Sequence, residues 1–519
     1  MSVIKSTFTV GSFTFLSRIA GFLRECVMVF CLGAGMYTDA LLVALGLANT
    51  FRRIFAEGAF NSSFLPRFSK VLHHEGKNEA NVVLSDVFSA LSIILVIFCS
   101  IVLFFFPSVL KVLVLGFDVL SEKFGLTVTL GRICFSYLFF ISITSLFGGV
   151  LNTINKFALP SALHSVLSLF TMAALLLSYF LDLSHFIMVH VVAVFVLLSG
   201  ITQSYILFLS IKRNGFSVSF RLKCWTDRVH DIMKNMIPGI IGTGVWQINM
   251  LIHMTIASYL PTGTITCINL ADRLNQFPLG TLGIALSTAL LPLLSKRIGA
   301  KKYEEAVKEL ERSLIFAFFL TFFATIVMIA LDVPTVAVSY QRGLFEEDQV
   351  IVTAKMLVGL TIGLPAYMLT KVFSAVYFAS GDTKSPVIFG AFSVILNVIF
   401  LVILVPFFKY FGMGLCTSLS AISNAVMLIY FSNRKIPIKF SKKFTCNIFA
   451  QVCASIVTYF CLTKLSDTLW TPEIGAQAVK WLIYISFIFI STLVFFITTA
   501  LFLKLLGQNN WKLWKKESW

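Results

Sequence analysis

Long apolar runs, separated by clusters of polar residues, glycine and proline, follow one another along almost the whole chain. A helix needs about 20 mostly apolar residues to cross a bilayer. The pattern therefore predicts fourteen membrane-spanning helices, at roughly residues 8–33, 38–58, 81–107, 127–152, 159–181, 186–211, 233–259, 265–294, 312–331, 351–379, 387–408, 412–432, 445–465 and 478–506. A β-barrel is excluded because its strands alternate polar and apolar residues.

The composition agrees with this pattern. Of the 519 residues 58% are apolar and 13% are charged, against about a quarter charged in soluble domains. These values exclude a soluble enzyme, a disordered chain and a nucleic-acid binder, despite the net charge of +17. The fold class is an all-α integral membrane protein, since helices satisfy their own backbone groups in lipid. The ten cysteines are scattered, most of them inside apolar runs, and we expect no disulfide, metal or cofactor.

The basic residues set the orientation. With the N-terminus in the cytoplasm, the inside segments hold 27 Lys and Arg residues and the outside segments hold six. Loops rich in Lys and Arg stay in the cytoplasm, so both termini are expected there.

Two halves of the chain resemble each other at a constant displacement of 226 residues. Ser63–Lys70 (SFLPRFSK) resembles Ala289–Lys296 (ALLPLLSK), and Phe147, Val150 and Pro160 match Phe373, Val376 and Pro386. The repeat predicts two six-helix lobes followed by two extra helices, an arrangement common in transporters. We expect an N-lobe at 1–228, a C-lobe at 229–440, and helices 13 and 14 with a cytoplasmic tail at 441–519.

Four arginines fall within predicted spans rather than at their ends. They are Arg18, Arg24, Arg52 and Arg273. An arginine at the centre of a span costs about 2.5–3.5 kcal/mol on insertion scales, so these side chains should line a wet cavity or pair with acids. The acids that can serve are Glu25, Asp39, Glu57 and Asp272.

The second half lacks these cations. At the 226-residue displacement, Arg18, Arg24 and Arg52 match Gly244, Met250 and Pro278. The fold therefore does not require these cations, and their presence in one half indicates a ligand site. A structural salt-bridge network is the alternative interpretation. Arginine suits a phosphate group because its guanidinium forms paired hydrogen bonds.

Several segments carry a family resemblance. The segments closely resemble the MurJ (MviN) family, lipid II flippases of the multidrug/oligosaccharidyl-lipid/polysaccharide exporter superfamily; they are Ser17-Arg18-x-x-Gly21-Phe22-x-Arg24-Glu25, Gly33-Ala34-Gly35, Asp39-Ala40, Asn49-x-x-Arg52-Arg53-x-Phe55-Ala56-Glu57-Gly58-Ala59-Phe60 and Ala271-Asp272-Arg273-Leu274-x-x-Phe277-Pro278. The chain departs from the family pattern at Ala48, where many members have proline, and at Cys31-Leu32, which replaces the usual phenylalanine.

The resemblance implies a function. It implies transfer of undecaprenyl-diphosphate-linked peptidoglycan precursor, lipid II, from the inner to the outer leaflet, by alternating access and without covalent chemistry. Carried over by position, Arg18, Arg24, Arg52 and Arg273 look like substrate-cavity residues, Asp39 looks like a functionally important acid, and Glu57 matches the motif. The final two helices look like the pair that forms a groove for the lipid tail.

Other functions stay open. A flippase for another polyprenyl-diphosphate glycan would need the same arginines. An ion-coupled drug exporter would instead depend on acids such as Asp39 or Glu57. A non-transporting scaffold is disfavoured, because it has no ligand to offset the free-energy cost of buried arginines. The energy source, whether membrane potential or a bound cation, and the protein partners are not readable from the sequence.

Overall fold

The computed structural model describes residues 3–54, 60–470 and 477–507, and within these ranges every regular element is a helix. Nine helices in the described part are long and apolar enough to cross a membrane. Two others, α1 (Val3–Leu32) and α10 (Asp227–Ala257), are as long, with 30 and 31 residues. The prediction of an all-α, multi-pass membrane protein is confirmed, whereas the count of fourteen spans stays a prediction.

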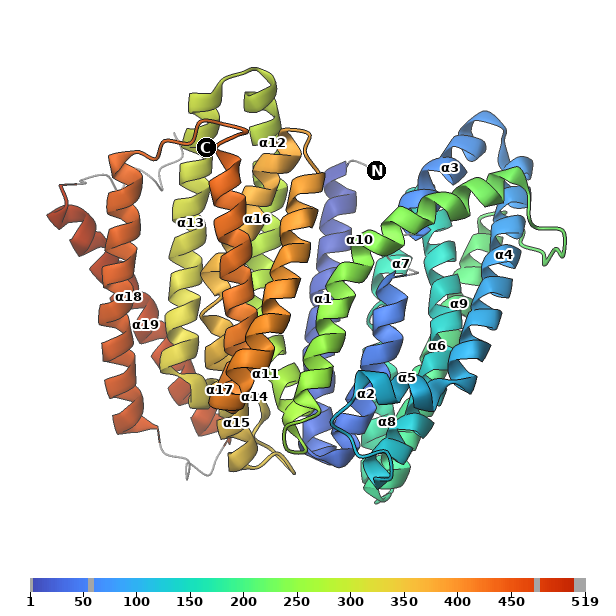
Figure 1. The fold of residues 1–519 in the computed structure, drawn as a ribbon, viewed down its shortest axis with the longest axis horizontal. Helices are drawn as coiled ribbons and strands as arrows, with labels where there is room; N and C mark the ends of the chain where they lie inside the picture. Colours follow the sequence, from blue (N-terminus) through green and yellow to red (C-terminus); the bar gives the residue numbers. More distant parts are fainter. Residues whose placement is uncertain (1–2, 55–59, 471–476, 508–519) are drawn as a thin grey trace. The chain divides into compact units, whose positions relative to one another are not determined.

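The chain folds as two compact units. Unit 1 comprises residues 1–266 and 342–345, and unit 2 comprises residues 267–341 and 346–519. In unit 1, α6 packs along α2 and α9, and α8 packs against α9 and α1 (Figure 1). Besides α1 and α10, unit 1 contains α2 (Met36–Arg52), α3 (Phe60–His74), α4 (Lys77–Phe104), α5 (Phe106–Leu113), α6 (Glu122–Thr153), α7 (Ala158–Leu163), α8 (Val166–Phe180) and α9 (His185–Arg213).

Unit 2 is built in a similar way. Here α16 packs between α12, α13 and α17, and α15 packs along α17. Its elements are most of α11 (Thr264–Pro278), the π-helical turn η2 (Leu279–Gly283), α12 (Ile284–Gly299), α13 (Tyr303–Ala330), α14 (Asp332–Tyr340), α15 (Glu347–Thr361), α16 (Leu364–Ala379), α17 (Lys384–Ser432), α18 (Lys442–Leu469) and α19 (Gln477–Leu505).

The helix boundaries repeat at the displacement found in the sequence. The helix α4 begins at Lys77 and ends at Phe104, and α13 begins and ends 226 residues later, at Tyr303 and Ala330. The ends of α2 and α11, at Arg52 and Pro278, are displaced by the same amount. The two halves therefore fold alike.

The helix α10 belongs to the second half by sequence but packs in unit 1. It contacts α3, α4 and α5, and Arg228 in its first turn pairs with Glu75 at 2.9 Å and Glu79 at 3.4 Å. The lobe boundaries at 228 and 440 follow the sequence repeat and stay predictions.

The linker before α10 is fixed along α4. Its backbone N–H groups at Ser217, Ser219 and Arg221 donate to side chains on α4: Asn81 at 3.1 Å, Ser85 at 3.2 Å and Ser89 at 2.8 Å. Alternate residues of an extended chain are about 6.6 Å apart, and every fourth residue of a helix rises about 6.0 Å. The two spacings match closely enough for three successive contacts.

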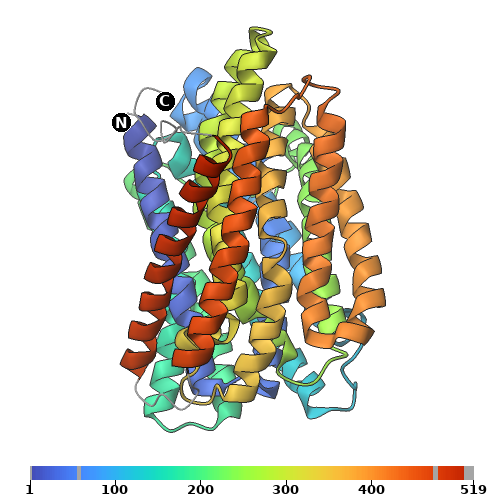
Figure 2. The same cartoon turned by 90° about the vertical axis from the view of Figure 1, so that its left-hand side faces the viewer.

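Three long helices complete unit 2. The helix α17 is broken at Lys409, where φ is 46° and ψ is −119°, so it contains two of the predicted spans. The helices α18 and α19 pack against each other and against α13 (Figure 2).

Candidate functional site

Three of the four predicted arginines lie on the helical hairpin α1–α2 of unit 1. Arg18 stands near the middle of α1, about 21 Å from its end at Leu32 at 1.5 Å per residue. Arg52 is the last residue of α2 and lies about 24 Å from that helix's start. Since the turn after Leu32 joins the two helices, Arg18 and Arg52 lie at similar depth along the hairpin, and Arg24 lies closer to the turn.

The surroundings of these arginines differ. Arg24 Nη2 donates to Glu25 Oε1 at 3.0 Å, with 15% and 7% of the two side chains exposed. Arg52 Nε donates to Asn49 Oδ1 at 3.2 Å, three residues earlier on α2. Arg18 is half-buried and has no ion pair or hydrogen bond within the described part of the chain. Arg24 is therefore already paired with an acid.

The fourth arginine lies in unit 2. Arg273 is half-buried on α11, next to Asp272, whose carboxylate accepts a hydrogen bond from Gln276. Glu57 lies outside the described residues.

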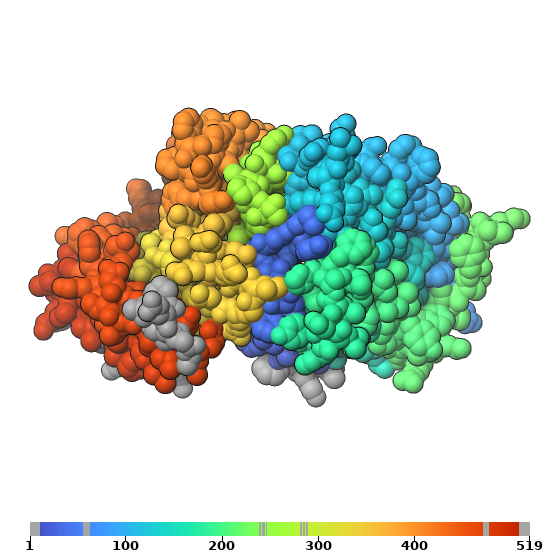
Figure 3. Space-filling model, turned by 90° about the horizontal axis from the view of Figure 1, so that it is seen from below, coloured from blue at the N-terminus to red at the C-terminus, as the bar shows by residue number. Residues whose placement is uncertain are grey.

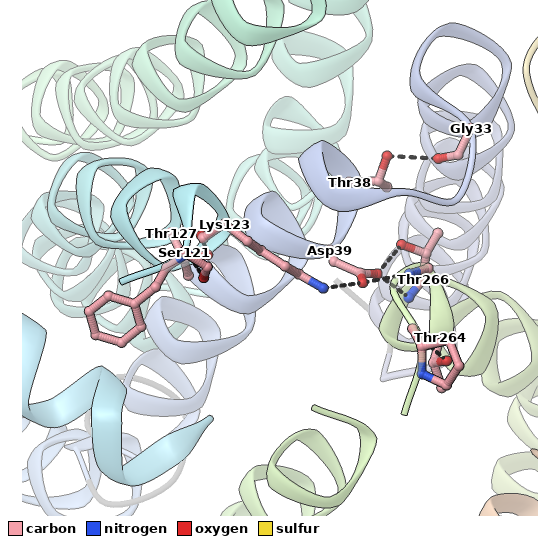
Figure 4. A network of polar contacts seen from close by, with 11 residues as sticks. Gly33, Thr38, Asp39, Ser121, Lys123, Thr127, Thr264 and Thr266 are labelled. Carbon is pink, nitrogen blue, oxygen red and sulfur yellow. Dashed lines mark hydrogen bonds and ion pairs between the residues drawn. The ribbon is translucent and has the colours of Figure 1, made fainter. Parts of the chain in front are cut away.

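Asp39 lies in the first turn of α2 and is 1% exposed. Its carboxylate accepts from Lys123 Nζ at 2.8 Å, from the N–H groups of Gly263 at 2.7 Å and Thr266 at 3.0 Å, and from Thr266 Oγ1 at 2.7 Å (Figure 4). Gly263 and Thr266 flank the start of α11, where N–H groups have no partner within the helix. Asp39 therefore caps a helix more than 220 residues away, and its charge suits the positive end of the helix dipole.

Backbone contacts tighten the turn between α1 and α2. Gly33 has φ +63°, and a Cβ there would lie 2.6 Å from the carbonyl oxygen of Leu344. Leu344 N donates to Phe30 O at 3.2 Å, and Thr38 Oγ1 donates to Gly33 O at 2.7 Å. The turn thus requires glycine at position 33, for its backbone conformation and for the close approach.

A second pair of contacts lies at the same end of unit 1. Gly116 N donates to Ser258 Oγ at 2.9 Å, and Thr255 Oγ1 donates to Leu113 O at 2.7 Å. In Figure 3 the segment that follows α5, in cyan, lies beside the end of α10, in light green. These bonds hold the end of α10 against the last residue of α5 and the segment that follows it.

The sequence did not indicate Lys123, Gly263 or Thr266 as partners of Asp39. Lys123 follows a turn and resembles any cation at a helix end, and it is 84 residues from Asp39. A glycine before Thr264, as in Pro261-Thr262-Gly263, marks a turn but not what binds there. Within the described residues no three His, Cys, Asp or Glu side chains form a group that could hold a metal ion.

Comparison with known proteins gives consistent results. The family model described as lipid II flippase MurJ matches residues 28–500. A protein of Rhizobium tropici named probable lipid II flippase MurJ is 33% identical over 429 residues, which cover 82% of this chain and 80% of that protein. A protein of Rickettsia prowazekii with the same name is 31% identical over 518 residues, covering 98% and 99%.

Solved structures share the fold. A lipid II flippase MurJ in an inward closed conformation superposes with a TM-score of 0.79 at 24% identity, covering 96% of this chain and 99% of that chain. An inward-facing transporter of the multidrug resistance MATE family, in the MOP superfamily, gives a TM-score of 0.68 at 15% identity, covering 83% and 98%.

Proposed function

Since this chain belongs to the lipid II flippase MurJ family, we propose that it moves lipid II across the cytoplasmic membrane of a bacterium. The substrate is a peptidoglycan precursor on undecaprenyl diphosphate, and it passes from the inner to the outer leaflet. Both termini lie in the cytoplasm, as the distribution of Lys and Arg indicates. The reaction changes no covalent bond, so the residues bind and release a charged head group.

The observation that carries this proposal is the position of Arg18. It is half-buried in the middle of a 30-residue helix and has no anionic partner within the described residues. Such a charge costs about 2.5–3.5 kcal/mol in a membrane, and a diphosphate would offset that cost through charge-assisted hydrogen bonds. Arg18 is therefore the primary phosphate ligand.

The other arginines complete the binding site. Arg52 lies at a depth similar to that of Arg18, so both can contact one head group. Arg24 reaches the substrate when it exchanges Glu25 for a phosphate oxygen. Arg273 and Glu57 are assigned to head-group binding because they match the family's sequence motifs.

Asp39 keeps the predicted outer end of the hairpin closed. Opening that end requires its carboxylate to leave Lys123 and the start of α11. The N-lobe (1–228) and C-lobe (229–440) then alternate between two arrangements, while residues 441–519 guide the polyprenyl tail. Charge-assisted hydrogen bonds are worth about 1.5–3 kcal/mol each, enough to hold one end shut until the head group binds.

Flipping by the purified chain in liposomes tests the proposal. Arg18→Gln should lower the rate of lipid II transfer about tenfold or more, as expected for loss of one charged hydrogen bond. Arg132→Gln is the matched control, since Arg132 is exposed on α6 and should be neutral. Wild-type transfer by the Arg18→Gln variant would refute the site. Equal transfer of other polyprenyl-diphosphate glycans would favour a broader substrate class.

A further inference from the structure

An apolar groove of about 460 Å³ lies in unit 2, between α18 and the helices α13, α16 and α17. It falls within the range of about 300–1,000 Å³ that small-molecule sites occupy. Its floor includes Leu314 and Phe318 of α13 and Ile429 of α17, and its wall includes Phe444 and Phe449 of α18. None of the described lining residues comes from α19, so the groove is separate from the space between α18 and α19.

The wall on α18 is one helical stripe. Thr445, Phe449 and Val452 line the groove and are spaced by four and three residues, which places them on one face. Lys442 lies three residues before Thr445, on the same face and in the first turn of α18. The apolar stripe therefore ends in a cation at one mouth of the groove.

The opposite wall on α13 has the same order. Leu314 and Phe318 line the groove, and Glu311 and Lys308 precede them at intervals of three residues. The Glu311 carboxylate is already engaged, because it accepts hydrogen bonds from the N–H and the hydroxyl of Ser441. This contact joins α13 to the start of α18 at the mouth of the groove. Lys308 is then the charged residue that the α13 wall presents to a ligand.

Three lysines lie on the segments at this mouth. Glu305, the acid that interacts electrostatically with Lys308, already pairs with Arg297 and Lys302. Lys308, Lys439 and Lys442 are exposed, and none forms an ion pair within the described part of the chain. Nearby Lys435 is different, since it pairs with Asp382 at 2.8 Å. Three ammonium groups are thus carried by the segments that lead into one end of an apolar groove, in helices long and apolar enough to span a membrane.

We propose that this groove binds an anionic phospholipid of the leaflet at the lysine-rich end. One acyl chain occupies the groove between α13 and α18, and the phosphate lies among Lys308, Lys439 and Lys442. The groove is apolar along the part that lies within the membrane, and its cations lie at the membrane surface. A phospholipid has this arrangement of an anionic head and an apolar chain, and a protein segment does not. Basic pockets between spanning helices on the cytoplasmic side are typical of anionic lipid sites.

Native mass spectrometry of the detergent-purified full chain tests the site, with phosphatidylglycerol and phosphatidylcholine of identical acyl chains as probes. The wild type should retain phosphatidylglycerol several-fold better. K308Q/K439Q/K442Q should lower that retention about tenfold or more, since each basic residue near a membrane surface contributes to binding of anionic lipid. V452W should lower retention of both lipids by filling the groove. K464Q, near the other end of α18, should behave as wild type.

A phosphatidylglycerol carrying a diazirine on its acyl chain locates the site independently. Cross-links to the peptides around Leu314–Phe318 and Phe444–Val452 are expected. Cross-links confined to other helices, or unchanged retention in the triple lysine variant, would overturn the proposal. Displacement of phosphatidylglycerol by equimolar undecaprenyl phosphate would also overturn it, because the groove would then be a polyprenyl site. The three lysines are exposed, so their variants keep the test valid even where V452W fails to fold.

Discussion

Lys123 Nζ lies 2.8 Å from Asp39 Oδ2, and the side chains are 13% and 1% exposed. The residues displaced from them by 226, Gln349 and Ile265, carry no charge. The ion pair is therefore specific to one half of a repeated fold. Together with the N–H groups at the start of α11, it forms a charged contact that is almost completely buried.

A double-mutant cycle tests this pair. Removing one partner of a buried ion pair costs about 3–5 kcal/mol because the other charge stays buried. D39N and K123M should each lower the Tm of the detergent-purified protein by several degrees. D39N/K123M should lose less than the sum of the two, since no charge is left unpaired. Strictly additive losses would show that the two side chains act independently.

The turn at Gly33 gives a second prediction. An alanine at position 33 would combine a left-handed backbone, at a cost of about 1–2 kcal/mol, with a contact of 2.6 Å to the Leu344 carbonyl. Gly76 has φ +89° but open space around it, and Gly35 has open space and a negative φ. Thermal unfolding should therefore rank the variants as G33A least stable, then G76A, then G35A near wild type. Equal stability of G33A and G76A would mean that the contact with Leu344 gives way freely.

The sequence predicted the helices well because their apolar length and their repeat are local properties. It pointed to Asp39 through a motif, but the donors to Asp39 are 84 to 227 residues away. Those contacts depend on which helix ends meet, and no hydropathy pattern encodes that. Likewise, Arg24 and Glu25 are adjacent in sequence. Only the structure shows that the Glu25 carboxylate pairs with Arg24 and not with Arg18.

A different kind of signal was present in α4. Asn81, Ser85 and Ser89 recur every fourth residue of a mostly apolar helix, which marks a polar stripe that needs partners. The polar linker supplies them through Ser217, Ser219 and Arg221. The stripe could have been found from the sequence, but the linker's register along it could not.

This stripe allows a third prediction. S85A/S89A removes two hydrogen-bond acceptors, each worth about 1 kcal/mol. The fraction of molecules in which the linker is detached from α4 should therefore rise. Trypsin should then cleave after Arg221 and Lys223 about 30-fold faster, provided that opening is fast relative to cleavage. S136A is the control, because the Ser136 hydroxyl donates within its own helix, α6, to Arg132 O. Unchanged cleavage of S85A/S89A would mean that other contacts hold the linker.

The turn between α16 and α17 gives a prediction about pH. The Lys435 ammonium, 2.8 Å from Asp382, holds the pKa of that carboxyl well below its usual range, and hydrogen bonds from the N–H and hydroxyl of Ser385 act in the same direction. A lowered folded-state pKa means that the carboxylate stabilises the fold above its ordinary pKa of about 4 and that this stabilisation is lost as the pH falls below it. D382N should therefore lower the Tm slightly at pH 7, and its Tm should fall less than that of the wild type between pH 5 and pH 3.

D467N, at an exposed position without an ion pair in the described chain, should follow the wild-type pH profile. A D382N profile parallel to wild type would show that Asp382 does not contribute to acid sensitivity.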